Sequence, residues 1–344
     1  MAERDGVLQP PHPRERTEFV GHEAAEAELV AALAGGRLPH AWLIGGPEGI
    51  GKATLAYRFA RALLAGGSEG GSGSLAVDAG SRTARQVAAR SHPNLVVLER
   101  LAAEGEKAPA RFIPAASVRK ALGFFGTTSA DGGRRVAIVD SVEDLNLQGL
   151  NALLKTVEEP PAGAVILLVS HAPGRVLPTI RSRCRKLTLS RLAEHEVSEV
   201  IASLASADPP DPSAIRHAAV LADGSVGRAL ALLEPKRLSL VQELRTLLDE
   251  LPRVRTDRIL ALAERLADKR QEGEFEIAIE AMLRWAADRV RATTSAPPAR
   301  LAPLAEVCEK VAEAARSVET YNLDRRPLIV SAFGDLARAV RLAV

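Results

Sequence analysis

The chain has 344 residues, of which 47% are hydrophobic, with a formal net charge of +2 and two cysteines. This length exceeds the usual size of one compact domain, so we expect two or three domains with real hydrophobic cores. The near-neutral charge argues against a strongly basic nucleic-acid binder, and two cysteines far apart in the sequence argue against a disulfide framework.

Strands and helices are predicted to alternate in the first half of the chain. Residues 1–18 are polar and Pro-rich and hold no apolar signal segment, so we expect an extended start and a cytoplasmic protein without membrane contact. Short apolar runs predict strands at residues 41–44, 95–98, 136–140, 165–169 and 186–189. Helical periodicity predicts helices at residues 23–35, 55–64, 115–125 and 147–158. This alternation predicts an α/β domain with a parallel sheet up to about residue 189.

The strand signals stop after residue 189. A helix is predicted over residues 192–207, ended by a Pro-rich stretch, and two shorter helices follow to about residue 234. From about residue 238 to 344 the sequence has helical periodicity and predicts about five helices, with breaks near Pro252, Gly273 and Pro298. We therefore predict an all-α second part, with domains at residues 1–189, 190–236 and 237–344.

The stretch between the first strand and the next helix has the pattern of a phosphate-binding loop. It reads Gly46-Pro47-Glu48-Gly49-Ile50-Gly51-Lys52. Its glycines let the backbone turn tightly, so that N–H groups converge on phosphate oxygens at the start of a helix. Lys52 is placed to reach the terminal phosphates. A Gly-rich turn before a helix is the simpler interpretation, but the spacing, the lysine and the flanking elements together favour a nucleotide site.

One position departs from that pattern. The residue after the lysine should be Ser or Thr, whose hydroxyl binds Mg²⁺, but this sequence has Ala53. Thr54 lies one residue later, and because each helical residue turns by about 100°, its hydroxyl should point elsewhere. ATP binding is therefore expected to be weak or vestigial, with Mg²⁺ present only if ATP binds.

Asp140 ends an apolar strand, as does the acidic residue that holds Mg²⁺ in phosphate-loop enzymes. In those that hydrolyse ATP a glutamate often follows and activates water, but the next residue here is Ser141. Glu143 and Asp144 are expected to cap the next turn instead. Asp140 could also be a simple turn former at a strand end; we favour a nucleotide-site origin without active hydrolysis.

Three further residues are candidates for site chemistry. Arg183, between Ser182 and Cys184, could stabilise charge on a phosphoryl group, although residue chemistry alone favours a solvated surface arginine. Arg228 opens a predicted helix; it could touch a nucleotide at a domain boundary, or equally be a surface arginine at a helix start. Cys184 has no cysteine nearby, so a small buried apolar residue is expected there rather than a metal ligand.

Taken together, these stretches resemble the clamp-loader branch of the AAA+ ATPases, and within it the delta-prime subunits of bacterial DNA polymerase III. Residues 151–161 read Asn-Ala-Leu-Leu-Lys-Thr-Val-Glu-Glu-Pro-Pro and are followed by Ser-Arg-Cys, a combination specific to this group. The resemblance covers about residues 20–230 and rests on residues 46–52, 91–94, 135–140, 150–161 and 180–184. It implies an AAA+ domain, a small helical lid domain and a C-terminal collar bundle.

The resemblance also implies a function and partners. It implies a hetero-pentamer with delta and gamma/tau subunits, which uses ATP to place a sliding clamp on primed DNA. Arg183 would then be an arginine finger in a neighbour's ATP site. Ala53 and Ser141 depart from the motor subunits, which favours a stationary delta-prime-like subunit that has no polymerase activity and negligible ATPase.

Two alternatives remain open at this point. The chain could be a gamma/tau-like motor subunit that hydrolyses ATP, or an unrelated phosphate-loop NTPase that acts alone, which would leave the Ser-Arg-Cys stretch unexplained. The family often carries a four-cysteine zinc module after the phosphate-loop helix. Residues 66–92 contain no cysteine, so we predict no zinc.

Overall fold

The computed structural model describes residues 11–36, 38–66, 73–100, 112–126, 133–204, 210–268, 273–292 and 298–343. The chain forms two compact units, Met1–Leu230 and Ala231–Val344. Their boundary lies a few residues before the predicted start of the third domain at residue 237, and the two predicted domains that precede it share the first unit. The three-domain division stays a prediction.

A five-stranded parallel sheet forms the centre of the first unit. Its strands are β1 (Ala41–Gly45), β2 (Leu95–Glu99), β3 (Arg135–Asp140), β4 (Ala164–Ser170) and β5 (Arg185–Thr188). They lie in the order β2-β3-β4-β1-β5, and every pairing is parallel. All carboxyl ends therefore lie at one edge of the sheet and all amino ends at the other.

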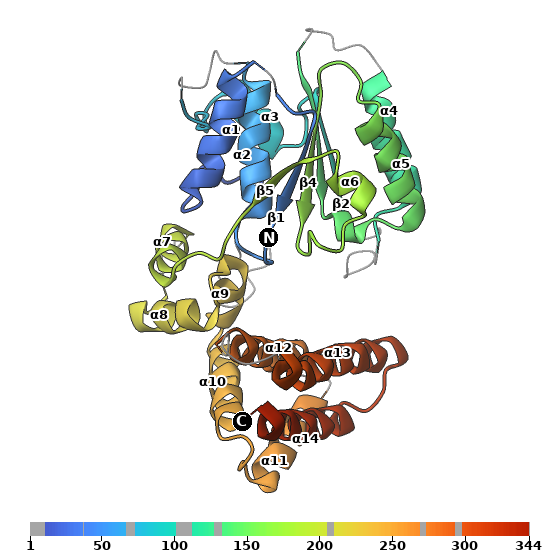
Figure 1. Cartoon of the computed structure of the whole chain (residues 1–344). Helices are drawn as coiled ribbons and strands as arrows, with labels where there is room; N and C mark the ends of the chain where they lie inside the picture. The colour runs from blue at the N-terminus through green and yellow to red at the C-terminus, as the bar shows by residue number, and fades with distance from the viewer. Residues whose placement is uncertain are drawn as a thin grey trace. The chain divides into compact units, whose positions relative to one another are not determined.

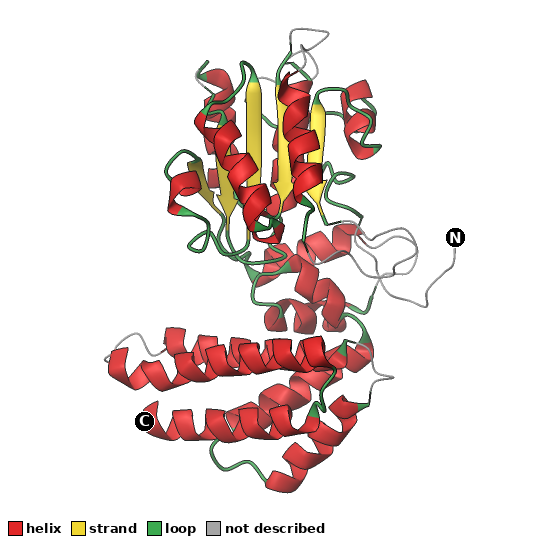
Figure 2. Cartoon of the chain, turned by 90° about the vertical axis from the view of Figure 1, so that its right-hand side faces the viewer, coloured by secondary structure: helices red, strands yellow, loops and turns green. Residues whose placement is uncertain are grey.

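Helices cover both faces of the sheet (Figures 1 and 2). One face carries α1 (Glu23–Ala34), α2 (Lys52–Leu64) and α3 (Arg82–Ala88), and the other carries α4 (Ala115–Gly123), α5 (Leu147–Glu158) and α6 (Pro178–Arg181). The strand period of two decides which side chain meets which layer: Trp42 and Ile44 pack with α1 and α2, while Leu43 packs with α4 and α5. The predicted α/β layer is confirmed.

The predicted elements differ from the observed ones mainly at their ends. The helix predicted at residues 147–158 is α5 with the same bounds, and the five predicted strands begin and end within one residue of β1 to β5. The short helices α3 and α6 were not predicted. The first lies between loop-like sequences and the second has only four residues, so neither has a periodic pattern long enough to recognise.

Three short helices complete the helical part near the end of the first unit: α7 (Glu194–Leu204), α8 (Pro212–Leu221) and α9 (Val226–Leu232). The helix predicted at residues 192–207 begins later than expected, and residues 205–209 lie outside the described part of the chain. Two residues mark the start of α8. The Asp211 carboxylate accepts a hydrogen bond from the Ser213 amide, and Pro212 occupies the first helical position, where a backbone N–H is not needed.

The second unit is helical in its described ranges. It contains α10 (Pro235–Asp249), α11 (Thr256–Ala267), α12 (Glu274–Ala292), α13 (Pro298–Tyr321) and α14 (Arg326–Ala343). Pro235 begins α10, again because a helix tolerates proline at its start.

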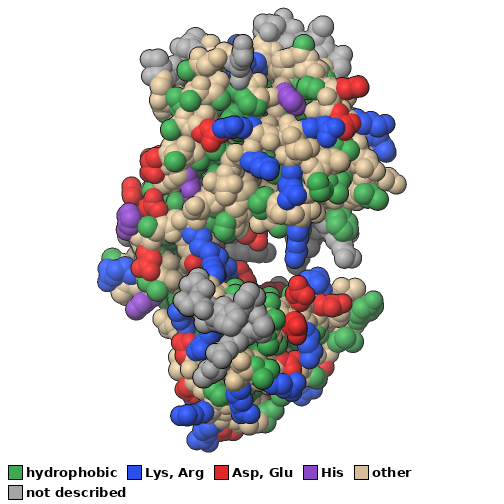
Figure 3. Space-filling view, in the orientation of Figure 1, with side chains coloured by type: hydrophobic (Ala, Val, Ile, Leu, Met, Phe, Trp, Pro, Cys, Tyr) green, Lys and Arg blue, Asp and Glu red, His purple; other side chains and the backbone are tan. Residues whose placement is uncertain are grey.

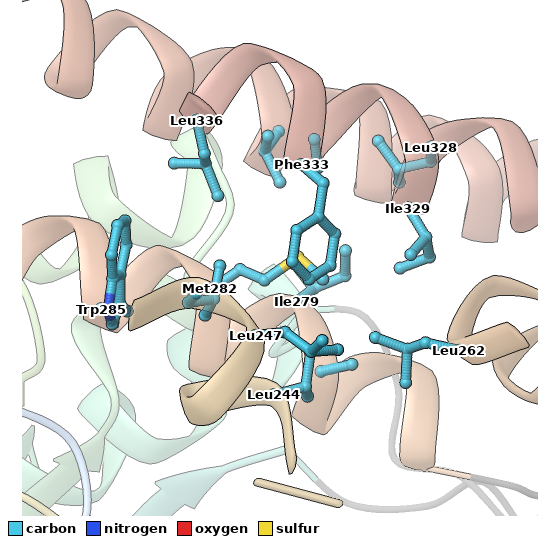
Figure 4. Close-up of a cluster of buried hydrophobic side chains, with 14 of the residues drawn as sticks. Leu244, Leu247, Leu262, Ile279, Met282, Trp285, Leu328, Ile329, Phe333 and Leu336 are labelled. Carbon is cyan, nitrogen blue, oxygen red and sulfur yellow. The ribbon is translucent and has the colours of Figure 1, made fainter. Parts of the chain in front are cut away.

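One apolar core holds the second unit together. Figure 4 shows Leu244 and Leu247 of α10 facing Ile279 and Met282 of α12, with Phe333 of α14 inserted among them. These five side chains are all buried. Burial of side chains this large stabilises a unit by about 1.5–3 kcal/mol each. None of the helices in the described ranges combines the length and the hydrophobicity needed to cross a membrane.

Candidate nucleotide site and surface arginine

A cavity of about 510 Å³ lies at the carboxyl edge of the sheet. Three parts of the first unit line it: the N-terminal segment around residues 11–20, the loop and helix start at residues 48–54, and apolar side chains of α7 and α9. Asp140 and His171 follow β3 and β4 and line it as well. The carboxyl edge of a parallel sheet is where ligands bind in α/β folds, so the sequence-predicted loop lies in the expected place.

The glycines of the loop have the conformations that the pattern requires. Gly46, Gly49 and Gly51 all have positive φ angles, of 150°, 74° and 98°. Gly49 also lies against the start of α9, because its carbonyl accepts a hydrogen bond from the Gly227 amide at 3.2 Å. A Cβ atom on Gly49 would lie 2.2 Å from the Ser225 hydroxyl. The loop therefore contacts the helical part of the unit directly.

Lys52 is buried, with 3% of the residue's surface exposed, and its ammonium group donates a hydrogen bond to the Pro47 carbonyl of its own loop. Burial lowers the pKa of Lys52 to about 8. The nearby carboxylates of Glu48, Asp140 and Glu143 oppose that shift without cancelling it. The lysine is thus positioned at the cavity, but it is engaged with its own backbone.

The acidic residues at the end of β3 and in the turn that follows make different contacts. Burial raises the pKa of Asp140, and the charges of His171 and Lys52 oppose that rise. The Ser141 amide and hydroxyl both donate to the Asp144 carboxylate, at 3.3 and 3.0 Å, so Asp144 caps the turn as predicted. The position where a motor enzyme would have its water-activating glutamate is therefore a buried serine committed to a cap.

Glu143 does not cap that turn, contrary to expectation. Its carboxylate accepts hydrogen bonds from the Ser170 hydroxyl and, at 2.9 Å, from the Ala172 amide, so it ties the turn after β3 to the end of β4. Burial alone would raise the pKa of Glu143, but these hydrogen bonds outweigh it and lower the pKa. The contact depends on β3 and β4 being neighbours, which no local pattern reveals.

Ala53 and Thr54 both line the cavity. Ala53 has no side-chain oxygen, so the hydroxyl ligand that the pattern would supply to a metal is missing. The direction of the Thr54 hydroxyl stays a prediction. Arg228 is not among the described residues that line the cavity, although its neighbour Gly227 is. The Arg228 amide donates a hydrogen bond to the Ser225 hydroxyl oxygen at 3.3 Å. Within the described ranges, no group of three His, Cys, Asp or Glu side chains could hold a metal ion.

The N-terminal segment is a part of the site that the sequence did not indicate. Two arginines of α2 bind its backbone: Arg58 donates to the Thr17 carbonyl at 2.5 Å, and the buried Arg61 donates to the carbonyls of Arg14, at 3.0 Å, and Arg16. The Arg16 side chain reaches the Ser203 hydroxyl of α7 at 3.3 Å. The segment was expected to be extended, and it crosses the phosphate-loop helix along one wall of the cavity.

Arg183 lies far from this cavity. It follows α6 and precedes β5, so it lies at the amino edge of the sheet, whereas the phosphate loop leaves from the carboxyl edge. Along the strand direction, Arg183 and the start of the phosphate loop are about 15 Å apart, the length of β5 and of the residues that precede it. Lys and Arg side chains gather on the face of the first unit that carries α6 and β5 (Figure 3).

The neighbours of Arg183 differ sharply in burial. Arg183 keeps 42% of its side chain exposed, donates to the Thr179 carbonyl at 3.0 Å and pairs with Glu158 at 3.1 Å. Ser182 is exposed, while Cys184 is buried in the core between the sheet and α5, which raises the pKa of its thiol to about 11. The apolar role expected for Cys184 is what its burial indicates.

Comparison with known proteins identifies the family. A family model described as "DNA polymerase III, delta subunit" matches residues 21–193. The chain belongs to this family. The DNA polymerase III subunit delta' of Pseudomonas aeruginosa is 41% identical over 154 residues, which are 44% of this chain and 43% of that protein. The Escherichia coli subunit delta' is 32% identical over 207 residues, 60% of this chain and 58% of that one. The predicted resemblance to the delta-prime subunits of bacterial DNA polymerase III is thereby confirmed.

More distant relatives extend further along the chain. The DNA polymerase III subunit tau of Salmonella typhimurium is 27% identical over 331 residues, 90% of this chain and 49% of that protein. The aligned regions thus span less than two thirds of each of these relatives. A solved Thermotoga maritima RuvB variant matches 81% of this chain and 81% of its own at 20% identity, with a TM-score of 0.42. The fold itself is a parallel α/β domain followed by helices, as predicted.

Proposed function

We propose that the chain acts as a delta-prime-like subunit of a DNA polymerase III clamp loader. In this role it assembles with delta and gamma/tau subunits in a hetero-pentamer that places a sliding clamp on primed DNA. It is a stationary subunit that contributes Arg183 to the ATP site of a neighbour. Family membership supports the assembly. The position of Arg183 and the state of the chain's own phosphate loop support the stationary role.

The observation that carries the proposal is the position of Arg183. Its guanidinium lies at the amino edge of the sheet, about 15 Å from the level of its own phosphate loop, so it has no access to a nucleotide bound there. It remains two fifths exposed, close in sequence to the exposed Arg185 and Lys186, and another subunit can pack there. A guanidinium is permanently charged and offers a rigid fork of donors that suits phosphate oxygens, so a role in another chain's site fits its chemistry.

The chain's own cavity supports the same division of labour. Ala53 supplies no metal ligand, and Ser141 is committed to its cap. Lys52 is bound to the Pro47 carbonyl, and α9 is bound to Gly49, so a triphosphate would have to displace groups that are already satisfied. Because phosphoryl transfer depends on positioning and charge stabilisation, we expect nucleotide to bind weakly here and to be hydrolysed negligibly.

A reconstituted loader tests the proposal. Complexes carrying Arg183→Ala should assemble normally. With clamp and primed DNA at saturation, they should hydrolyse ATP about tenfold more slowly than the wild type. This factor is smaller than the 10³–10⁵ of a lone arginine finger because several ATP sites contribute to the rate. Arg183→Lys should rescue little, because an ammonium group lacks the fork. Arg185→Ala is the matched control, since Arg185 is also exposed and ion-paired, to Glu28 at 2.7 Å. Unchanged rates with Arg183→Ala would refute the proposal.

One observation favours a second candidate, a gamma/tau-like motor subunit. The Salmonella typhimurium tau subunit aligns with 90% of this chain, more than either delta-prime relative does. A motor should turn over ATP as an isolated chain, and Lys52→Ala should abolish that activity. Turnover that is both measurable and lost in Lys52→Ala would favour the motor over the stationary subunit.

A further inference from the structure

The two terminal nitrogens of Arg183 are both engaged within the chain. Nη1 donates to the Thr179 carbonyl at 3.0 Å and lies 3.5 Å from the Ser182 hydroxyl, and Nη2 pairs with Glu158 Oε1 at 3.1 Å. These are the atoms with which a guanidinium grips a phosphate in a bidentate arrangement. A phosphate can therefore be gripped only after at least one of these intrachain contacts gives way.

The ion pair joins two places that the core already fixes. Glu158 is the last residue of α5, and its neighbour Val157 is buried in the same core as Cys184, the neighbour of Arg183. The two backbones are thus held at a set distance, and only side-chain rotation is needed to make or break the pair. No backbone ordering is needed for the contact, so only the entropy of two side chains, each about two fifths exposed, opposes the pair.

The next residue offers a matched comparison. Glu159 is also exposed, and within the described ranges its carboxylate has no recorded hydrogen bond or ion pair; its amide closes α5 on the Lys155 carbonyl at 3.0 Å. Two adjacent carboxylates thus differ in one respect, the contact with Arg183.

We propose that Glu158 is the intrachain competitor of the phosphate for Arg183, and that it sets how tightly a neighbour's nucleoside triphosphate engages this arginine. The inference rests on the proposed function. When no terminal phosphate is within reach, the Glu158 carboxylate binds the Arg183 guanidinium. When a triphosphate is present, its greater negative charge displaces the carboxylate from the guanidinium. Since a diphosphate lacks the terminal group that Arg183 would grip, its binding does not involve this exchange.

The exchange predicts a specific split between binding and turnover. With Glu158→Gln the competitor loses its charge, so the complex should bind a non-hydrolysable ATP analogue about threefold more tightly, the scale of a half-exposed ion pair. The KM for ATP should fall by the same factor. ADP affinity and kcat should stay unchanged, because neither depends on breaking the pair.

The test uses the reconstituted loader with wild-type, Glu158→Gln, Glu159→Gln and Arg183→Ala chains, and the doubly substituted Glu158→Gln/Arg183→Ala chain. Glu159→Gln should match the wild type, and Glu158→Gln should have no effect once Arg183 is absent. A fall in kcat with Glu158→Gln would overturn the inference, because it would make Glu158 a residue that positions Arg183 for catalysis. Wild-type behaviour of Glu158→Gln would also overturn it while leaving the proposed function intact, provided that Arg183→Ala slows the complex. If Arg183→Ala has no effect, the proposed function fails as well.

Discussion

Folding removes the Lys52 ammonium group from water, and this has a measurable consequence for stability. The pKa of Lys52 falls from its ordinary 10.5 to about 8 in the folded chain. A difference of about 2.5 units, at about 1.4 kcal/mol per unit, corresponds to about 3 kcal/mol. Because the folded pKa is the lower one, this cost is fully present below pH 8 and disappears as the pH rises towards 10.5.

Lys52→Met removes the charge but keeps an unbranched side chain. The free energy of unfolding of the wild-type first unit should therefore rise by about 3 kcal/mol relative to the variant between pH 7.5 and pH 10.5. The variant also loses the hydrogen bond to Pro47, which shifts its stability by a constant. The prediction therefore concerns how the difference in unfolding free energy between wild type and variant changes with pH, and not its value at one pH.

The two tryptophans of the chain make the assay specific to one unit. Trp42 is buried in β1 and Trp285 lies in α12, so in a Trp285→Phe background the fluorescence reports the first unit alone. Urea titrations at four pH values would compare this background with and without Lys52→Met, and Lys155→Met, which replaces a lysine on α5 that remains exposed, is the control. Stability curves that stay parallel from pH 7.5 to 10.5 would refute the reasoning that burial of the Lys52 charge costs free energy.

Three other predictions concern the loop, the metal and the second unit. Gly49→Ala should destabilise the first unit by about 1–3 kcal/mol more than Gly36→Ala, because both glycines have a φ near +70° but only the Gly49 Cβ would meet Ser225, and the same urea assay measures this. Nucleotide affinity of the isolated chain should be equal in Mg²⁺ and in EDTA, because Ala53 offers no metal ligand; a calorimetric titration that finds tighter binding with Mg²⁺ would contradict this. A chain that ends at Glu234, just before α10, should fold but fail to join the loader, and its co-elution with the partner subunits on size exclusion would show that the second unit is not required.

Much of the first unit could be predicted because its sequence signals are local. The strand at residues 164–170 is buried throughout and apolar up to Val169, so its pattern, its length and its place at the centre of the sheet agree. Helix α5 is framed by Asn146, whose side chain caps it, and by the two prolines that follow Glu159. The phosphate loop combines glycine spacing, a lysine and a helix start, which together leave few other folds.

The missed contacts all depend on residues that are distant in sequence. His171 lines the cavity only because β4 ends beside β3, and its one signal was a polar residue directly after a buried strand. Glu143 was expected in a cap because Asp144, its neighbour, has the same chemistry; the choice between them depends on the position of Ser170. The pairing of Arg183 with Glu158 likewise follows from how α5 and α6 pack.

The two arginines of α2 place a constraint on how the protein can be shortened or fused. Arg61 is almost fully buried, and it finds its acceptors outside its own helix, on the carbonyls of residues 14 and 16. A chain trimmed to begin at α1 would lose both of these hydrogen bonds to a charged group, at a cost of about 1.5–3 kcal/mol each. The same helix begins at Lys52, so the damage would reach the nucleotide cavity. Affinity tags and fluorescent fusions are therefore better attached beyond α14 than in place of the first twenty residues.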